Sequence, residues 1–327
     1  MAVITGASSG IGRACARAFA EAGYQLGLIA RSIEGLEAAA REAREAGSEA
    51  SVLQGDVADA DTLERLAVLT EDQLGPIDVW INNAMVTVLS PVVDMKPDEF
   101  RRVVEVNYLG TVHGTLAALR RMRPRDRGTI VQVGSALAYR SIPLQSAYCA
   151  SKAATRAFTD SLRSELIHDG SAIHLTMVQL PAVNTPQFDV MRNRMPRKPQ
   201  PVPPIFAPQT IGRAILYATE HPSRELVAGG SSLQAIIAQK LIPGLVDKYL
   251  GRTGYDAQQR DEVEQCDRPD NLFQAIPGDR GAEGAFSANS RSFSIQLWLR
   301  EHPVAALLSS AAVVLATGAF AAKHRSS

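Results

Sequence analysis

The chain has 327 residues, and its 34 basic and 34 acidic side chains give a formal net charge of zero at pH 7. Because 46% of the residues are hydrophobic and 21% are charged, the composition indicates a globular protein, and it gives no electrostatic reason to expect a nucleic-acid partner. The three cysteines form no CxxC pair and the six histidines form no HxxxH or HExxH pair, so we expect a reducing compartment and no metal site.

Apolar runs that are typical of strands alternate with helical segments along the first 230 residues. The predicted strands span residues 1–5, 26–30, 52–53, 79–81, 129–133, 173–178 and 226–227. The predicted helices span residues 10–22, 33–46, 62–74, 97–122, 147–168 and 211–220. Continuous apolar strands are buried on both faces, and their alternation with helices predicts an α/β fold with a doubly wound parallel sheet over residues 1–250. In such sheets ligands bind beyond the carboxyl ends of the strands.

The C-terminal part has a different character. Residues 251–292 are rich in polar residues, glycine and proline, and we expect a solvated, disordered linker there. Residues 293–303 form an amphipathic segment with Trp298. Residues 304–322 then form an uncharged apolar run, which as a helix of about 1.5 Å per residue would almost cross a bilayer core of about 30 Å.

We interpret 304–322 as a C-terminal transmembrane helix that anchors a cytoplasmic folded domain, because the polar linker leaves it without an obvious partner in the core. The alternative is a buried or oligomerising alanine-rich helix in a wholly cytoplasmic protein. Alanine is only weakly hydrophobic, and Ser309, Ser310 and Thr317 further dilute the signal.

A glycine-rich stretch, TGASSGIG, follows the first strand and opens the first helix. Glycines let the backbone approach a phosphate closely, and a helix N-terminus favours its negative charge. The stretch therefore predicts a dinucleotide site, although a tight loop would also use glycine. The cofactor-binding candidates in it are Thr5, Gly6, Ser8, Ser9, Gly10, Ile11 and Gly12.

Tyr148 and Lys152 lie four residues apart on one predicted helix, so their side chains share a face. A nearby ammonium favours the phenolate and lowers the pKa of the tyrosine, which then exchanges a proton with a carbonyl or an alcohol more readily. Ser135 lies thirteen residues before Tyr148. A proton donor beside a dinucleotide site indicates hydride transfer.

These motifs together resemble the short-chain dehydrogenase/reductase family. The resemblance covers about the first 230 residues and rests on motifs that occur in the family's order. They are TGASSGIG at 5–12, Asp56-Val57, Asn82-Asn83-Ala84, Asn107, Ser135 and YCASK at 148–152. The resemblance implies a Rossmann-type fold of seven strands, a nicotinamide cofactor and an Asn-Ser-Tyr-Lys tetrad, and we also expect a homo-oligomer.

The resemblance implies a role for each tetrad residue. Tyr148 is the proton donor or acceptor, and Lys152 lowers its pKa and binds the nicotinamide ribose. Ser135 orients the substrate oxygen, and the backbone of Asn107 holds a water in the proton relay. Taken alone, Ser135 would be a strand-end cap and Asn107 a polar helix residue.

The resemblance also implies further cofactor contacts. Asp56 accepts from the adenine amino group, although by itself it reads as a turn residue after a strand. Asn83 contacts the ribose side of the cofactor. The remaining candidates are Val57 and Ala84, together with Pro181, Val183 and Thr185 in the segment that closes over the nicotinamide.

Cofactor choice depends on Arg31, at the end of the second predicted strand. A guanidinium suits the 2′-phosphate of NADP(H), whereas an NAD-specific site places an acid there. We therefore favour NADP(H) and keep NAD(H), with a solvent-facing Arg31, as the alternative. One departure from the family is Met85, which stands where a glycine usually follows Asn-Asn-Ala.

The sequence thus predicts an NADP(H)-dependent oxidoreductase that interconverts a carbonyl and an alcohol. If the protein is anchored to a membrane, we expect a lipophilic small-molecule substrate. The alternative is a dinucleotide-binding scaffold or regulator at the membrane without turnover.

Overall fold

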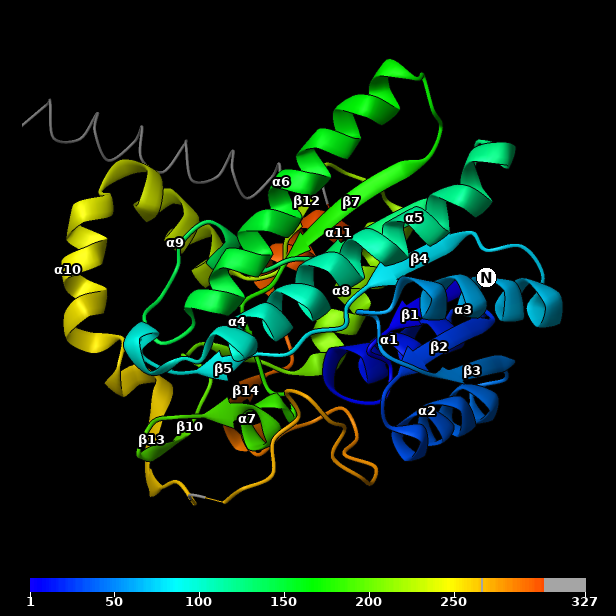
Figure 1. Ribbon diagram of the computed structural model, residues 1–327. Coiled ribbons are helices and arrows are strands. Elements are labelled where there is room, and N and C mark those ends of the chain that lie inside the picture. The colour runs from blue at the N-terminus through cyan, green and yellow to red at the C-terminus, as the bar shows by residue number, and fades with distance from the viewer. Residues whose placement is uncertain (266, 303–327) are drawn as a thin grey trace, which may run out of the picture.

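The computed structural model describes residues 1–265 and 267–302. Its centre is a seven-stranded sheet in the order β12-β7-β6-β4-β1-β2-β3, and all neighbouring strands are parallel (Figure 1). These strands are β1 (Ala2–Thr5), β2 (Leu26–Ala30), β3 (Ala50–Gln54), β4 (Val79–Asn82), β6 (Thr129–Val133), β7 (His174–Gln179) and β12 (Glu225–Val227). The predicted doubly wound Rossmann-type fold is confirmed.

Helices cover both faces of this sheet. One face carries α1 (Gly10–Glu21), α2 (Ile33–Glu45) and α8 (Pro208–Glu220). The other carries α3 (Ala60–Leu74), α4 (Pro97–Val104), α5 (Gly110–Met122) and α6 (Ser146–His168), which lie in front of the sheet in Figure 1. Each face has its own apolar cluster, with Phe19 fully buried in one and Trp80 in the other. Burial on both faces explains why the strands are continuous apolar runs.

The sheet reverses its direction of winding at β1, which lies between β2 and β4. Ligands of open α/β sheets bind at such a point, beyond the carboxyl ends of the strands. The chain here runs from Thr5 into the glycine-rich turn, and β4 runs into the Asn83–Ala84 loop. The predicted motifs therefore meet at one edge of the sheet.

The long helix predicted over residues 97–122 is interrupted. Between α4 and α5 the chain forms a π-helical turn, η2 (Glu105–Leu109), which contains Asn107. Such turns occur frequently at functional sites. Thr111 of α5 donates its hydroxyl hydrogen to the carbonyl oxygen of Asn107 at 2.8 Å.

Smaller elements complete the fold. The short strands are β5 (Val88–Leu89), β8 (Ala182–Val183), β9 (Arg192–Asn193), β10 (Arg197–Pro199), β11 (Ile205–Phe206), β13 (Gln259–Val263) and β14 (Ser290–Arg291). The helices are α7 (Gln187–Val190), α9 (Gly230–Leu241), α10 (Pro243–Thr253) and α11 (Ile295–Glu301). The 3-10 turns are η1 (Val92–Asp94), η3 (Arg123–Arg125), η4 (Ala136–Ala138), η5 (Asp256–Gln258) and η6 (Ser287–Asn289).

Residues 251–292 differ from the expected disordered linker. They return to the Rossmann domain, where β13 pairs antiparallel with β10 and β14 pairs parallel with β11. Leu272 is fully buried in the apolar cluster on the α3–α6 face. Two kinds of contact hold this polar segment. Strands β10 and β11 pair with part of its backbone, and its charged side chains form ion pairs, such as that of Asp270 with Arg192 at 2.8 Å.

The segment 293–303 also packs on the domain over its described part. Leu297 of α11 is buried, and the Ser294 hydroxyl donates to the carbonyl oxygen of Ala228 at 2.9 Å. The predicted transmembrane run 304–322 lies outside the described residues. Within residues 1–265 and 267–302, no helix has the length and apolar character needed to cross a membrane.

Candidate active site

Hydrogen bonds of Thr5 join the glycine-rich turn to the end of β4. The Thr5 hydroxyl accepts from the backbone N–H groups of Asn83 at 2.9 Å and Ala84 at 3.0 Å. In return, the side-chain amide of Asn83 donates to the carbonyl oxygen of Thr5 at 2.9 Å. A Cβ on Gly12 would lie 2.1 Å from the carbonyl oxygen of Gly6, so only glycine fits where the helix starts.

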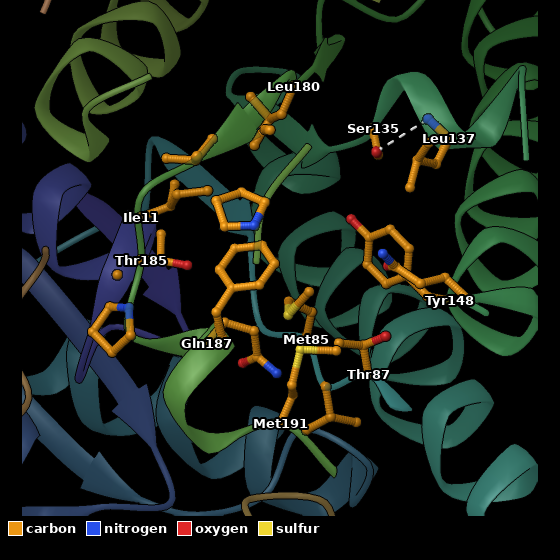
Figure 2. A pocket seen from close by; sticks show the side chains of 18 of the residues that line it. Ile11, Met85, Thr87, Ser135, Leu137, Tyr148, Leu180, Thr185, Gln187 and Met191 are labelled. Carbon is orange, nitrogen blue, oxygen red and sulfur yellow. Dashed lines mark hydrogen bonds between the residues drawn. The ribbon is translucent and has the colours of Figure 1, made fainter. Parts of the chain in front are cut away.

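Ser135 and Tyr148 lie on one side of a cavity, across from Ile11 and Thr185 (Figure 2). Ser135 follows β6 and accepts from the backbone N–H of Leu137 at 3.1 Å, which fixes its hydroxyl at the cavity wall. Tyr148 projects from the first turn of α6. Lys152, one turn further, is buried and donates to the carbonyl oxygen of Val133 at 2.7 Å.

The electrostatics differ from the sequence-based expectation. Desolvation raises the pKa of Tyr148 to about 12, and the neighbouring Ser135 hydroxyl opposes this shift only in part. Desolvation also lowers the pKa of Lys152 to about 8, since its surroundings supply a carbonyl oxygen but no carboxylate. In the protein without a bound cofactor, desolvation thus sets the net direction of the Tyr148 pKa, and the lowering expected from Lys152 stays a prediction.

Asn107 lies behind the cavity wall and is fully buried. Its side-chain amide accepts from the backbone N–H of Val86 at 2.8 Å and donates to the carbonyl oxygen of Val86 at 3.0 Å. It also donates to the hydroxyl of Ser151 on α6 at 3.1 Å. These contacts hold the loop after β4 against the helix that carries Tyr148. The water-binding role of the Asn107 backbone stays a prediction.

One continuous cavity of about 500 Å³ joins the two motifs, from the end of β2 to the tyrosine. Its wall includes most of the residues predicted from the sequence, namely Gly6, Ser8, Ser9, Gly10, Ile11, Arg31, Asp56, Val57, Asn83, Ala84, Ser135, Tyr148, Lys152, Pro181, Val183 and Thr185. Thr5, Gly12 and Asn107 lie behind this wall and shape it. The structure thus brings the predicted catalytic and cofactor residues into one site.

Asp56 and Arg31 have partners that the sequence did not indicate. Asp56 accepts from the backbone N–H of Ala58 at 3.0 Å and forms an ion pair with Arg102 of α4. Arg31 donates to the backbone carbonyl oxygens of Asn271 and Leu272, which come from the segment expected to be a linker.

Comparison with known families agrees with this geometry. The family model described as short chain dehydrogenase matches residues 1–195, which is more than half of the chain. The chain belongs to the short-chain dehydrogenase/reductase family.

This short-chain dehydrogenase/reductase is similar to several known proteins. It is 31% identical to an uncharacterized oxidoreductase, YxnA, of Bacillus subtilis, over 99% of this chain and 90% of that protein. It is 42% identical to dehydrogenase/reductase SDR family member 7B of Mus musculus, over 50% of this chain and 52% of that protein. Among solved structures, an alcohol dehydrogenase of Thermococcus sibiricus complexed with 5-hydroxy-NADP matches with a TM-score of 0.59 and 30% identity, over 69% of this chain and 94% of that one.

The residues of this dehydrogenase/reductase fit an adenine dinucleotide. Gly6 and Gly10 have positive φ values of 69° and 59°, which place the turn close to the cavity without side chains in the way. Three of the five N–H donors of Arg31 remain for a phosphate, because two are used by carbonyl oxygens. The N-terminus of α1 adds a favourable field for a pyrophosphate.

No motif in the sequence marks the cavity residues Thr87, Gln187 and Met191, whereas Met85 was noted there as a departure from the family. Met85 and Met191 lie beside each other near Thr87 and Gln187 (Figure 2). The Thr87 hydroxyl and the Gln187 Nε2 are buried without a hydrogen-bond partner. Met85, where the family usually has glycine, thus forms part of the cavity wall. Further lining comes from α9 and α10 through Ala235, Tyr249, Leu250 and Thr253.

Proposed function

We propose that this protein is an NADP(H)-dependent oxidoreductase that interconverts a lipophilic carbonyl compound and the corresponding alcohol. The observation that carries the proposal is that Ser135, Tyr148 and Lys152 share one cavity with the glycine-rich turn and Arg31. The cavity thus holds a proton donor, Tyr148, for the substrate, together with the glycine-rich turn and Arg31 for the phosphates of a dinucleotide.

A nicotinamide held near Tyr148 and Lys152 would supply the hydride, or accept it in the oxidative direction. In reduction, Tyr148 gives its hydroxyl proton to the substrate oxygen, while the Ser135 hydroxyl holds that oxygen in place. A protonated Lys152 stabilises the phenolate that results. Because burial lowers the pKa of Lys152 to about 8, its charge falls away above that pH in the cofactor-free protein.

The preference for NADP(H) rests on Arg31, whose planar guanidinium suits a 2′-phosphate. The Thermococcus sibiricus relative is described in complex with 5-hydroxy-NADP, and a metagenomic short-chain oxidoreductase, 27% identical with a TM-score of 0.58, is described in complex with NADP. These relatives support the same cofactor class for this chain, with NAD(H) as the alternative.

A lipophilic substrate is supported by the apolar side chains that line the cavity it would share with Tyr148. Among them are Leu137, Ile142, Phe188, Met191, Val202 and Leu250. The basic side chains of residues 192–198, which could attract an acidic substrate, are already paired: Arg192 and Arg194 with Glu99, Arg197 with Asp256, and Lys198 with Glu262.

Anchoring to a membrane through residues 304–322 is part of the proposal. It is supported by the outer surface of α9 and α10, beside the cavity mouth, which exposes apolar and basic side chains together. These are Leu233, Ile237, Leu241, Ile242, Leu245 and Tyr249, with Lys240, Lys248 and Arg252. Such a mixture suits the headgroup region of a bilayer.

The test is a carbonyl and alcohol screen of the full-length protein in liposomes, with NADPH and NADH in parallel. We expect oxidation of NADPH with long-chain or steroid-like ketones, and a lower kcat/KM with short polar ketones. Tight NADPH binding without turnover on any substrate would instead support the non-catalytic scaffold.

A further inference from the structure

Residues 270–284, which we call the strap, run along the open side of the cavity. The strap lies beyond the family-model match, which ends at residue 195. Its residues Asn271, Ala275, Ile276, Gly278 and Arg280 line the same cavity as the glycine-rich turn and Tyr148. The solved relatives are covered over 94–95% of their chains but match only 69% of this one, whereas the Bacillus subtilis relative aligns over 99% of it.

The first end of the strap is held at the adenosine side of the site. The carbonyl oxygen of Leu272 accepts from Arg31 at 3.3 Å and from Nε of Arg102 at 3.1 Å, and that of Asn271 also accepts from Arg31. The Leu272 side chain is fully buried, so this end is fixed by packing as well as by charge-assisted hydrogen bonds.

The other end is held at the glycine-rich turn. The carbonyl oxygen of Gly281 accepts from the backbone N–H of Gly10 at 3.0 Å, and Asp279 pairs with the buried Arg13 of α1 at 3.3 Å. Gly278 and Gly281 have φ values of 94° and 62°, so the chain turns at both positions. Between the two ends, Ala275, Ile276 and Gly278 line the same cavity as the end of β2 and the glycine-rich turn.

Asn271 also joins the strap to α7. Its backbone N–H donates to the carbonyl oxygen of Val190 at 2.8 Å, and its side-chain Nδ2 donates to Oε1 of Gln187 at 3.2 Å. The Oδ1 of Asn271 and the Nε2 of Gln187 are then left buried without a hydrogen-bond partner, in two residues that line the cavity. A buried acceptor and a buried donor at one point favour a polar ligand, because each is costly to leave unsatisfied.

We infer that the strap is the outer wall of the dinucleotide site and that Asn271 is a cofactor-binding residue of this enzyme. The ligand is the adenosine half of an adenine dinucleotide, since the strap contacts Arg31, Arg102 and the glycine-rich turn. Asp56 is already engaged by Arg102, so Asn271 supplies the free acceptor at this end. The inference rests on the proposed function, and it adds the strap to the residues that retain the cofactor.

The test measures binding rather than turnover, by NADPH fluorescence and by calorimetry with 2′-phospho-ADP-ribose and with nicotinamide mononucleotide. The variants are Asn271→Ala and Asp279→Ala, which release the strap at opposite ends, and the control is Gln274→Ala at an exposed strap position outside the cavity. Asn271→Ala should raise the Kd for NADPH and for 2′-phospho-ADP-ribose roughly tenfold through a faster koff, and Asp279→Ala should act in the same direction. Nicotinamide mononucleotide should bind both variants as it binds the wild type.

Hydrogen exchange gives a second measurement on the wild-type protein. Amides of residues 270–284 should exchange more slowly when NADPH is bound. Unchanged exchange, or equal affinities of Asn271→Ala and Gln274→Ala, would overturn the role of the strap while leaving the proposed function intact. A wild-type protein that binds neither NADPH nor NADH would overturn both.

Discussion

The side-chain amide of Asn107 forms two hydrogen bonds with the backbone of Val86. Its Oδ1 accepts from the Val86 N–H at 2.8 Å, and its Nδ2 donates to the Val86 carbonyl oxygen at 3.0 Å. Val86 follows Met85, the residue that stands where the family usually has glycine. We expect Asn107→Ala to lower the free energy of unfolding by roughly 1–3 kcal/mol, because it leaves buried backbone groups unpaired. It should also lower kcat/KM, since the Met85–Thr87 wall of the cavity loosens.

Urea unfolding and steady-state kinetics measure both effects. The matched control is Thr111→Val, which removes the bond to the Asn107 carbonyl oxygen but leaves the amide pair intact. If Asn107→Ala unfolds at the same urea concentration as the wild type, the pair does not support the loop.

Tyr148→Phe should lower kcat by at least about 10²-fold while the Kd for NADPH changes little, because only the transferable proton is lost. The control is Tyr139→Phe, whose hydroxyl donates to Glu225 at 2.6 Å away from the cavity. Substantial activity in Tyr148→Phe would assign the proton transfer to another group.

Arg31→Asp should reduce the ratio of kcat/KM for NADPH to that for NADH by roughly tenfold or more, because a carboxylate repels the 2′-phosphate. Arg31→Lys keeps the positive charge but loses the planar guanidinium, so its ratio should lie between those of the wild type and Arg31→Asp. Since Arg31 also holds the strap, both cofactors are expected to bind Arg31→Asp less tightly. An unchanged ratio would show that Arg31 acts on the strap alone.

Lys152 should contribute a rise in the free energy of unfolding with increasing pH. Its folded-state pKa is about 8, below the ordinary value of 10.5, so between these values the unfolded state binds more protons. The free energy of unfolding should therefore rise with pH in this window, by at most roughly 3 kcal/mol, and the gain is absent below pH 8. Tyr148 acts in the opposite direction above pH 10, because its folded-state pKa of about 12 lets the unfolded state ionise first.

Urea titrations of the cofactor-free wild type and Lys152→Met between pH 7.5 and about 9.5 isolate the lysine as a difference. Burial raises the pKa values of Cys15 and Cys149, which oppose the rise equally in both proteins. Lys152→Met should remove the rise, so that the difference between wild type and variant changes with pH. Parallel curves for the two proteins would mean that Lys152 keeps its ordinary pKa in the fold.

Truncation should separate the strap from the apolar run. A chain that ends at residue 302 should keep its thermal stability and NADPH binding but leave the membrane fraction after expression. A chain that ends at residue 268 should lose stability, because it removes the buried side chains of Leu272 and Leu297. Equal melting temperatures for the two would contradict the packing of the strap.

The sequence by itself determined the sheet, the helices that cover it and the place of the site. Apolar strands and helical periodicity are local signals. Each motif, from the glycine-rich turn to the Tyr148–Lys152 pair, also consists of residues that are close together in the chain. Once the strands are parallel, their carboxyl ends must meet, so Ser135 and the glycine-rich turn were bound to share an edge.

Only the tertiary structure decided what surrounds those motifs. Arg31 and Asn271 are 240 residues apart, and a polar segment with one buried leucine shows no periodicity that predicts their contact. The raised pKa of Tyr148 likewise depends on desolvation by burial, which only the folded structure supplies. Long-range packing, and not local pattern, thus turned an expected linker into a wall of the cavity.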